Sequence, residues 1–164
     1  MTRDEERAIE WDCQKLWREY YYHVDHRDFE QAAALFTNDI DWTNSMGVVL
    51  SGREELLKGL YGALGDGTIR HVLTNMVVEV VDEDHANARA YNSIYYAKGV
   101  KFEEHDGPIP FEGPHRTGDN YTEFLRTEEG WRISKRRSNI VFRRNPEERV
   151  GLEIWSEKAG KMEK

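Results

Sequence analysis

The first part of the chain places apolar and polar residues with the period of an α-helix. Over residues 5–24, apolar side chains recur every three or four positions and charged side chains fill the positions between them. The apolar set is Ile9, Cys13, Leu16, Trp17, Tyr20, Tyr21 and Val24. This spacing predicts a long amphipathic helix that buries one face. Residues 29–36 predict a second, shorter helix, with Asp28 and Gln31 as a capping box at its start.

The next segment combines short strands with a third helix. Residues 39–43 and 47–50 predict two strands around a turn at residues 44–47. The sequence S-G-R-E is a capping box that opens a helix over residues 53–64. A glycine-rich loop, residues 65–68, ends this helical part of the chain.

From His71 onward the apolar period changes to two, which is typical of strands. Strands are predicted at residues 71–81, 87–97, 119–127 and 131–143. The short polar turns D-E-D-H and T-E-E-G imply antiparallel hairpins. A proline- and glycine-rich loop over residues 103–119 joins the middle two strands. This order predicts an α+β domain, with N-terminal helices packed on one face of a curved, mostly antiparallel sheet that encloses a pocket.

Length and composition fit one globular domain. The chain has 164 residues, of which 38% are hydrophobic and 33% charged. We expect residues 1–146 to form the domain and the charged residues 147–164 to form a C-terminal extension. The five Trp, eight Tyr and six Phe exceed what packing requires. Any single ring is more often part of a core than of a ligand pocket.

Charge and motifs exclude several classes of function. A net charge of −8 argues against partners such as nucleic acid or an anionic membrane surface. No apolar stretch is long enough to span a bilayer, and no signal-peptide core is present, so we expect a cytoplasmic protein. The single cysteine, Cys13, is expected to be a buried apolar residue. The sequence lacks metal-ligand spacing and a glycine-rich strand-to-helix loop, so we expect no metal and no nucleotide cofactor.

Two residues are candidates for proton transfer. Asp25 follows the first helix, where the helix dipole disfavours a carboxylate unless it has a cationic or hydrogen-bonding partner. It is either an exposed loop residue, a partner of Arg27, or functional. His71 is either a satisfied, partly buried histidine or a general base, since its ordinary pKa of about 6.5 suits proton abstraction near neutral pH. Asp25 would then orient His71, although their spacing alone does not show that they meet.

Three stretches resemble the SnoaL-like branch of the nuclear transport factor 2-like superfamily. They are "YYYHVDHRDFEQAAALFTNDIDW", "GTIRHVLTNMVVEVV" and "NYTEFLRTEEGWRISKRR", and they occur in the expected order over about residues 5–145. This branch includes polyketide cyclases, scytalone dehydratase, bile-acid dehydratase and hexachlorocyclohexane dehydrochlorinase. The resemblance implies a cone-shaped α+β barrel with a deep apolar pocket, usually assembled into homodimers or homotrimers.

The resemblance also implies roles for single residues. Dehydratase and dehydrochlorinase members use an Asp–His dyad, which Asp25 and His71 match. Tyr20 matches a tyrosine that lies five residues before the aspartate in the bile-acid type. Trp42 replaces a tyrosine of the scytalone type, so scytalone is not the expected substrate. An arginine on the last strand contributes to some sites; Arg137 either serves in this way or is a solvated strand residue.

Together these observations lead us to expect a cofactor-independent enzyme of the lyase or isomerase type. His71 would abstract a proton from an apolar, ring-containing small molecule, in a dehydratase-like, isomerase or polyketide cyclase reaction. Tyr20, or else Tyr21, would donate a hydrogen bond to a carbonyl or a departing hydroxyl, and Trp42 would form a pocket wall. The alternative is a non-catalytic small-molecule-binding or structural subunit, as in the dioxygenase small subunits, because a fold does not imply one function.

Overall fold

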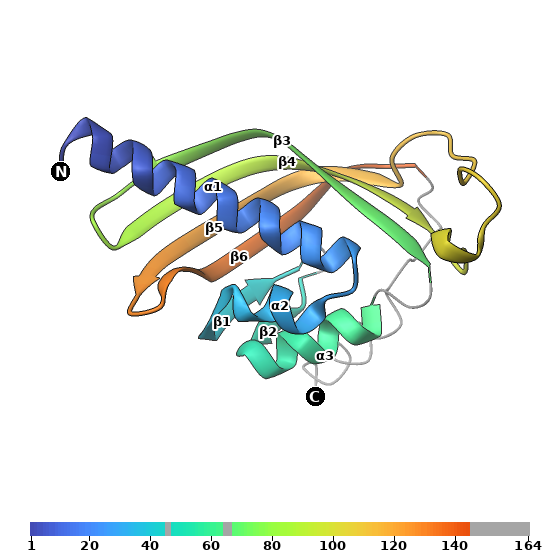
Figure 1. Ribbon diagram of the computed structural model, residues 1–164, viewed down its shortest axis with the longest axis horizontal. Helices are drawn as coiled ribbons and strands as arrows, with labels where there is room; N and C mark the ends of the chain where they lie inside the picture. The colour runs from blue at the N-terminus through green and yellow to red at the C-terminus, as the bar shows by residue number, and fades with distance from the viewer. Residues whose placement is uncertain (45–46, 64–66, 145–164) are drawn as a thin grey trace.

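The computed structural model in Figure 1 describes residues 1–44, 47–63 and 67–144. In chain order the elements are α1 (Arg3–Asp25), α2 (Phe29–Ala34), β1 (Phe36–Thr43), β2 (Val49–Ser51), α3 (Arg53–Ala63), β3 (Thr68–Val80), β4 (His85–Ala97), the short 3-10 helix η1 (Phe102–Glu104), β5 (Arg116–Thr127) and β6 (Gly130–Arg143). The α+β class is confirmed. The predicted tail, residues 147–164, and parts of the predicted turn and loop lie outside the described residues.

The long helix α1 is stabilised at its start and along its apolar face. The Thr2 hydroxyl accepts a hydrogen bond from the Glu5 backbone N–H (3.3 Å), and the Glu5 carboxylate accepts one from the Thr2 N–H (2.6 Å). All seven apolar positions of the predicted stripe are buried. The prediction of an amphipathic helix is therefore confirmed. None of the described helices is both long and apolar enough to cross a membrane.

The strands form one open, curved sheet. Their order is β2-β1-β6-β5-β4-β3. The β1–β6 pair is parallel and the other neighbouring pairs are antiparallel, so the sheet is mixed. The sheet does not close into a barrel. The helix α1 runs across β3, β4, β5 and β6, while α2 and α3 lie beside β1 and β2 (Figure 1). The core lies between these helices and the inner face of the sheet, and includes Trp17, Phe36, Phe124 and Ile133.

The helix α2 differs from its prediction at both ends. Asp28 precedes the helix, but its side chain makes no capping hydrogen bond. Its carboxylate lies 3.5 Å from His23 Nδ1 on α1 instead. The helix ends at Ala34 rather than at Phe36, because Phe36 is buried as the first residue of β1.

The predicted capping box of α3 is shifted by one residue. The Ser51 backbone N–H donates to the carboxylate of Glu55 (3.1 Å), not to that of Glu54. The reason is that Gly52, with a φ of 85°, is the residue directly before the helix, and its carbonyl accepts the first helical hydrogen bond, from Leu56 (3.1 Å). The helix itself begins where the sequence predicts it.

Candidate active site

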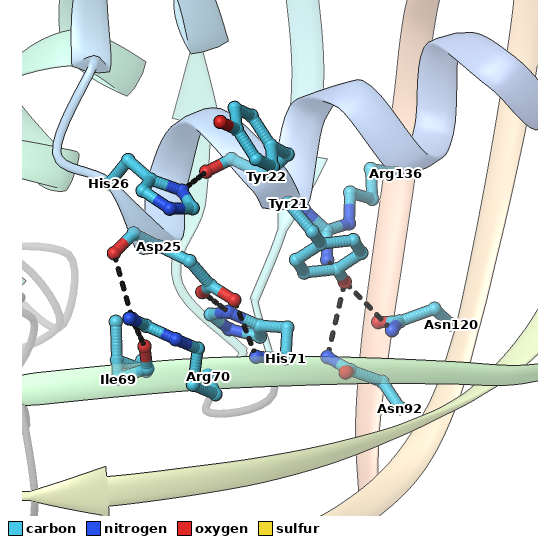
Figure 2. Close-up of polar contacts among 10 residues, drawn as sticks. All are labelled: Tyr21, Tyr22, Asp25, His26, Ile69, Arg70, His71, Asn92, Asn120 and Arg136. Carbon is cyan, nitrogen blue, oxygen red and sulfur yellow. Dashed lines mark hydrogen bonds and ion pairs between the residues drawn. The ribbon is translucent and has the colours of Figure 1, made fainter.

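Asp25 and His71 meet where the end of α1 reaches the start of β3. Asp25 is the last residue of α1, and its Oδ1 lies 2.6 Å from His71 Nδ1. Its Oδ2 accepts a hydrogen bond from the His71 backbone N–H at 2.8 Å (Figure 2). Both side chains are only 8% exposed. Asp25 is therefore neither an exposed loop residue nor the partner of Arg27.

Two arginines fix the end of α1 against β3. Arg27, with a left-handed φ of 64°, follows the helix and donates to the Gly67 carbonyl (2.5 Å). Arg70 donates to the carbonyls of Asp25 (3.2 Å) and Ile69 (2.7 Å) (Figure 2). The last carbonyls of a helix have no partner within the helix, so Arg70 satisfies one of them with a positive charge. These contacts hold the Asp25 side chain in register with His71.

The environment of His71 favours its neutral form. Burial lowers the pKa of His71 below its ordinary value of 6.5, against the opposing effect of the Asp25 carboxylate. The positive charges of Arg136 and Arg116 lower that pKa further. Because Nδ1 faces a carboxylate oxygen, Nδ1 carries the hydrogen and Nε2 keeps its lone pair. A neutral imidazole with a free Nε2 is the form that a general base requires.

A small cavity of about 120 Å³ lies beside this pair. Four of the residues singled out from the sequence line it: Tyr20, Tyr21, Trp42 and His71. Asp25 lies behind His71 and does not line the cavity. The walls therefore combine aromatic rings from α1 and β1 with polar side chains from the inner face of β4, β5 and β6.

Tyr21 is the tyrosine whose ring packs on the imidazole. The ring centroids of Tyr21 and His71 are 4.6 Å apart. The Tyr21 oxygen accepts hydrogen bonds from Asn92 Nδ2 (3.2 Å), Asn120 Nδ2 (3.0 Å) and Arg136 Nη2 (Figure 2). Tyr20 also lines the cavity. Burial raises the pKa of both tyrosines, so both phenols keep their hydrogen near pH 7.

Arg136, which the sequence reasoning did not select, occupies the centre of the site. It is 3% exposed. Its guanidinium carbon lies 4.8 Å from the ring centroid of Tyr20, 4.9 Å from that of Tyr21 and 5.0 Å from that of Trp42. Its Nε and Nη1 atoms are buried and have no hydrogen-bond partner. A buried cation with two free donors is suited to hold a negative charge on a ligand.

Arg137, the arginine predicted for this site, is not part of the cavity. It is exposed on the opposite face of the sheet, where it lines a broad, open depression. Of the two alternatives for Arg137, the structure therefore shows the solvated strand residue, and Arg136 lines the cavity instead.

A bulge in β6 explains why Arg136, and not Arg137, faces the cavity. Phe124 of β5 pairs with Ile133, but its neighbour Glu123 pairs with Lys135, so Ser134 is an extra residue in β6. A one-residue shift moves side chains to the other face of a sheet. After the bulge, the first of the two consecutive arginines points inward and the second points outward.

Other chemically reactive groups are placed as follows. Cys13 is buried on α1, and burial raises the pKa of its thiol to about 12. In the part of the chain that the structure describes, no cluster of three or more His, Cys, Asp or Glu side chains has the arrangement of a metal site.

Comparison with known families gives the geometry a context. Residues 5–137, most of the chain, match the SnoaL-like domain family. The chain belongs to the SnoaL-like domain family. This confirms the resemblance seen in the sequence. No curated protein matches the sequence of this SnoaL-like protein.

Solved structures with the same fold include several with assigned names. A candidate scytalone dehydratase from Novosphingobium aromaticivorans is 19% identical with a TM-score of 0.74, over 91% of this chain and 95% of that one. A hexachlorocyclohexane dehydrochlorinase from Novosphingobium barchaimii is 17% identical with a TM-score of 0.67, over 87% and 92%. A nuclear transport factor 2-like protein with a cystatin-like fold, from Novosphingobium aromaticivorans, is 24% identical with a TM-score of 0.66, over 82% and 84%. Identities this low show a shared fold.

The site of this SnoaL-like protein combines a buried imidazole and a buried guanidinium at one cavity. His71 lines the cavity, and its Nδ1 atom faces the Asp25 carboxylate on the side away from it. The guanidinium of Arg136 lies against the ring of Tyr21, which packs on His71, so a molecule in the cavity would lie beside both the imidazole and the guanidinium. Negative charge that develops on such a molecule would meet a buried donor.

Proposed function

We propose that this protein is a cofactor-independent enzyme of the lyase or isomerase type, with a dehydratase-like elimination as its reaction. The observation that carries the proposal is the buried hydrogen bond between Asp25 and His71, 2.6 Å long, with the imidazole lining a cavity. His71 is the general base. Asp25 is a positioning residue, because it fixes the tautomer of His71 without lining the cavity.

The other site residues support the same chemistry. Arg136 stabilises negative charge on the substrate carbonyl through its free Nε and Nη1 atoms. Three donors surround the Tyr21 oxygen, and no described residue accepts its hydrogen, so that hydrogen is available for a carbonyl or a departing hydroxyl. Tyr20 and Trp42 pack against the guanidinium of Arg136 and hold it in place.

In the elimination, His71 Nε2 takes a proton from a carbon next to a carbonyl group. The electron pair of the broken C–H bond forms a carbon–carbon double bond. A hydroxyl group leaves the neighbouring carbon with its bonding pair and takes up the proton from the imidazolium, so that water is released and His71 is neutral again. Two of the structural neighbours, the candidate dehydratase and the dehydrochlorinase, have names that denote eliminations.

The cavity limits the size of the substrate. Its volume of about 120 Å³ is close to that of a cavity that binds one benzene ring, about 150 Å³. A compact molecule with one ring fits the cavity better than a polycyclic one.

Proton transfer to carbon can be tested without knowing the natural substrate. One-ring ketones and β-hydroxyketones are incubated with the protein in D₂O, and NMR follows deuterium at carbon and the loss of water. We expect His71→Gln to slow exchange by about 10²–10⁴-fold, the usual contribution of a general base. The matched control is His26→Gln, because His26 is exposed at the same end of α1; it should react like the wild type. Equal rates for the wild type and His71→Gln would rule out His71 as the base.

A second candidate is a non-catalytic binding or structural subunit. The small cavity favours it, since ligand pockets usually measure about 300–1,000 Å³. In that case the wild type would give no more exchange or water loss than His71→Gln with any compound of the series.

We further propose that the protein forms a homodimer or homotrimer through the outer face of the sheet. The helices cover the inner face of the sheet (Figure 1). The outer face exposes Val77, Tyr91 and Tyr121 on neighbouring strands. Light scattering of the wild type and of Tyr121→Glu tests this: the wild type should have at least twice the mass of the variant. Equal masses would contradict it.

A further inference from the structure

Two guanidinium groups line the cavity, and no carboxylate from the described residues lines it with them. They belong to Arg116 on β5 and Arg136 on β6. The ion pairs between described residues include neither of them. The nearby carboxylate of Asp25 is already engaged by His71. The cavity is thus electropositive, although the whole chain has a net charge of −8.

Arg136 shows that this positive charge is built into the site. Its side chain is 3% exposed, yet two of its nitrogens have no acceptor. Removing a cation from water costs several kcal/mol, and contact with aromatic rings offsets only part of that cost. A negatively charged ligand would supply the missing acceptors.

Arg116 adds a second charge at an unfavourable place. Burial lowers the pKa of Arg116, and the positive charge of Arg143 lowers it further. Arg116 and Arg143 are directly opposite each other on β5 and β6. Like charges in opposite positions destabilise a sheet. The Arg116 side chain makes no hydrogen bond with a described residue, so its donors are available at the cavity wall.

We propose that the substrate is a compact molecule that carries a carboxylate, which Arg116 binds, while the acidic C–H faces His71 and the carbonyl oxygen faces Arg136. This assignment rests on the proposed function for the C–H and the carbonyl. The carboxylate site itself depends on the positive charges of Arg116 and Arg136 and on the absence of a competing acid along the described cavity wall. The molecule is therefore an oxo-acid or hydroxy-oxo-acid rather than a neutral ketone.

The carboxylate site can be tested by binding alone. The probes are benzoate and benzamide, which have nearly the same shape and differ in charge. Isothermal titration calorimetry at pH 7 should show that the wild type binds benzoate at least tenfold more tightly than benzamide, the ratio expected from one charged hydrogen bond. Benzoate affinity should fall with added salt, whereas benzamide affinity should not.

Substitutions test which arginine is responsible for the preference for benzoate. Arg116→Gln should reduce the benzoate preference at least tenfold and leave benzamide binding unchanged, and Arg116→Lys should retain most of the preference because it keeps the charge. The matched control, Arg137→Gln, removes an arginine from the opposite face of the sheet and should bind both probes like the wild type. Equal affinity for the two probes in the wild type, no benzoate binding at millimolar concentration, or an unchanged preference in Arg116→Gln would overturn the proposal.

The same experiment separates this proposal from the proposed function. His71→Gln should still prefer benzoate, since Arg116 is intact. If benzoate preference depends on Arg116 but His71→Gln does not alter proton exchange at carbon, the carboxylate site stands and the assignment of His71 as base fails. If His71 is required for exchange but Arg116→Gln leaves the benzoate preference unchanged, the assignment of His71 as base stands and the carboxylate site fails.

Discussion

Arg136 and Arg137 are consecutive residues of β6 that lie on opposite faces of the sheet. Arg136 is buried against three aromatic rings in the cavity, and Arg137 is exposed in an open depression on the outer face. The outer face also carries acidic partners for its cations, such as Glu123 for Lys135. Along the described cavity wall no acid accompanies Arg136. An arginine is thus an ordinary surface residue on the outer face and a buried positive charge on the inner face. The backbone bulge decides which of the two arginines lies on which face.

The largest expected effect distinguishes these two arginines by activity. Arg136→Met should lower kcat/KM by about 10²–10³-fold, the loss found when one donor to a developing oxyanion is removed. Arg137→Met should leave kcat/KM within about twofold of the wild type, since a solvent-exposed residue away from the cavity contributes little to the reaction. Steady-state kinetics with any compound that the wild type converts would check this.

Unlike the activity, the stability of Arg136→Met should not fall. Arg136→Met removes the desolvation cost of a buried cation, which is several kcal/mol per ion, so urea unfolding should show unchanged or increased stability. A variant that unfolds more easily and loses activity in proportion would show that Arg136 has a structural role.

A second comparison uses neighbouring tyrosines of α1. Tyr21→Phe leaves the donors of Asn92, Asn120 and Arg136 without their shared acceptor. We expect a loss of about 1–3 kcal/mol in the free energy of unfolding, the cost of unsatisfied buried polar groups. Tyr22 is exposed, so Tyr22→Phe should change stability by less than about 0.5 kcal/mol. Equal changes in urea unfolding would mean that the Tyr21 hydroxyl is not part of the buried network.

The pH dependence of stability should reflect the burial of His71. Burial lowers the pKa of folded His71 below 6.5, so the unfolded state binds more protons between the folded and unfolded pKa values. The contribution of His71 is therefore full above about pH 6.5 and is lost as the pH falls toward its folded pKa. His71→Gln should flatten this part of the stability profile.

The smallest effect is expected for the outer-face ion pair. Glu123 and Lys135 lie 3.6 Å apart, and both are at least one third exposed. Solvent screens such a pair, so Glu123→Gln should change the free energy of unfolding by less than about 1 kcal/mol. A larger loss would mean that the outer face is covered, as in the proposed homo-oligomer. Unfolding measurements at two protein concentrations would separate the two explanations.

The helix-to-strand order and the first helix were predictable because they depend on local periodicity. All seven apolar residues of α1 are buried as predicted, and the four long strands start and end within a few residues of the predicted bounds. The capping residues were less predictable. A capping box has the same letters whether or not the side chain turns toward the backbone, and Asp28 does not.

The sequence identified single residues of the candidate site, but not the contacts between them. Asp25 and His71 are 46 residues apart in sequence, so their contact depends on how α1 packs on β3, which periodicity does not give. Arg136 was missed for a different reason. The resemblance implied an arginine on the last strand but not which of two consecutive arginines faces inward, and the extra residue at Ser134 turns Arg136 inward and Arg137 outward. A bulge leaves no clear mark in one sequence.

The most direct test of the account is the protonation state of His71, measured by ¹⁵N NMR of the imidazole ring as a function of pH. We predict a neutral ring at pH 7 with the hydrogen on Nδ1 and a bare Nε2, and a pKa below 6.5. In Asp25→Asn, the preference for the Nδ1–H tautomer should weaken, because the carboxylate that fixes it is gone. A ring that is charged at pH 7, or one that carries its hydrogen on Nε2, would contradict the assignment of His71 as the base.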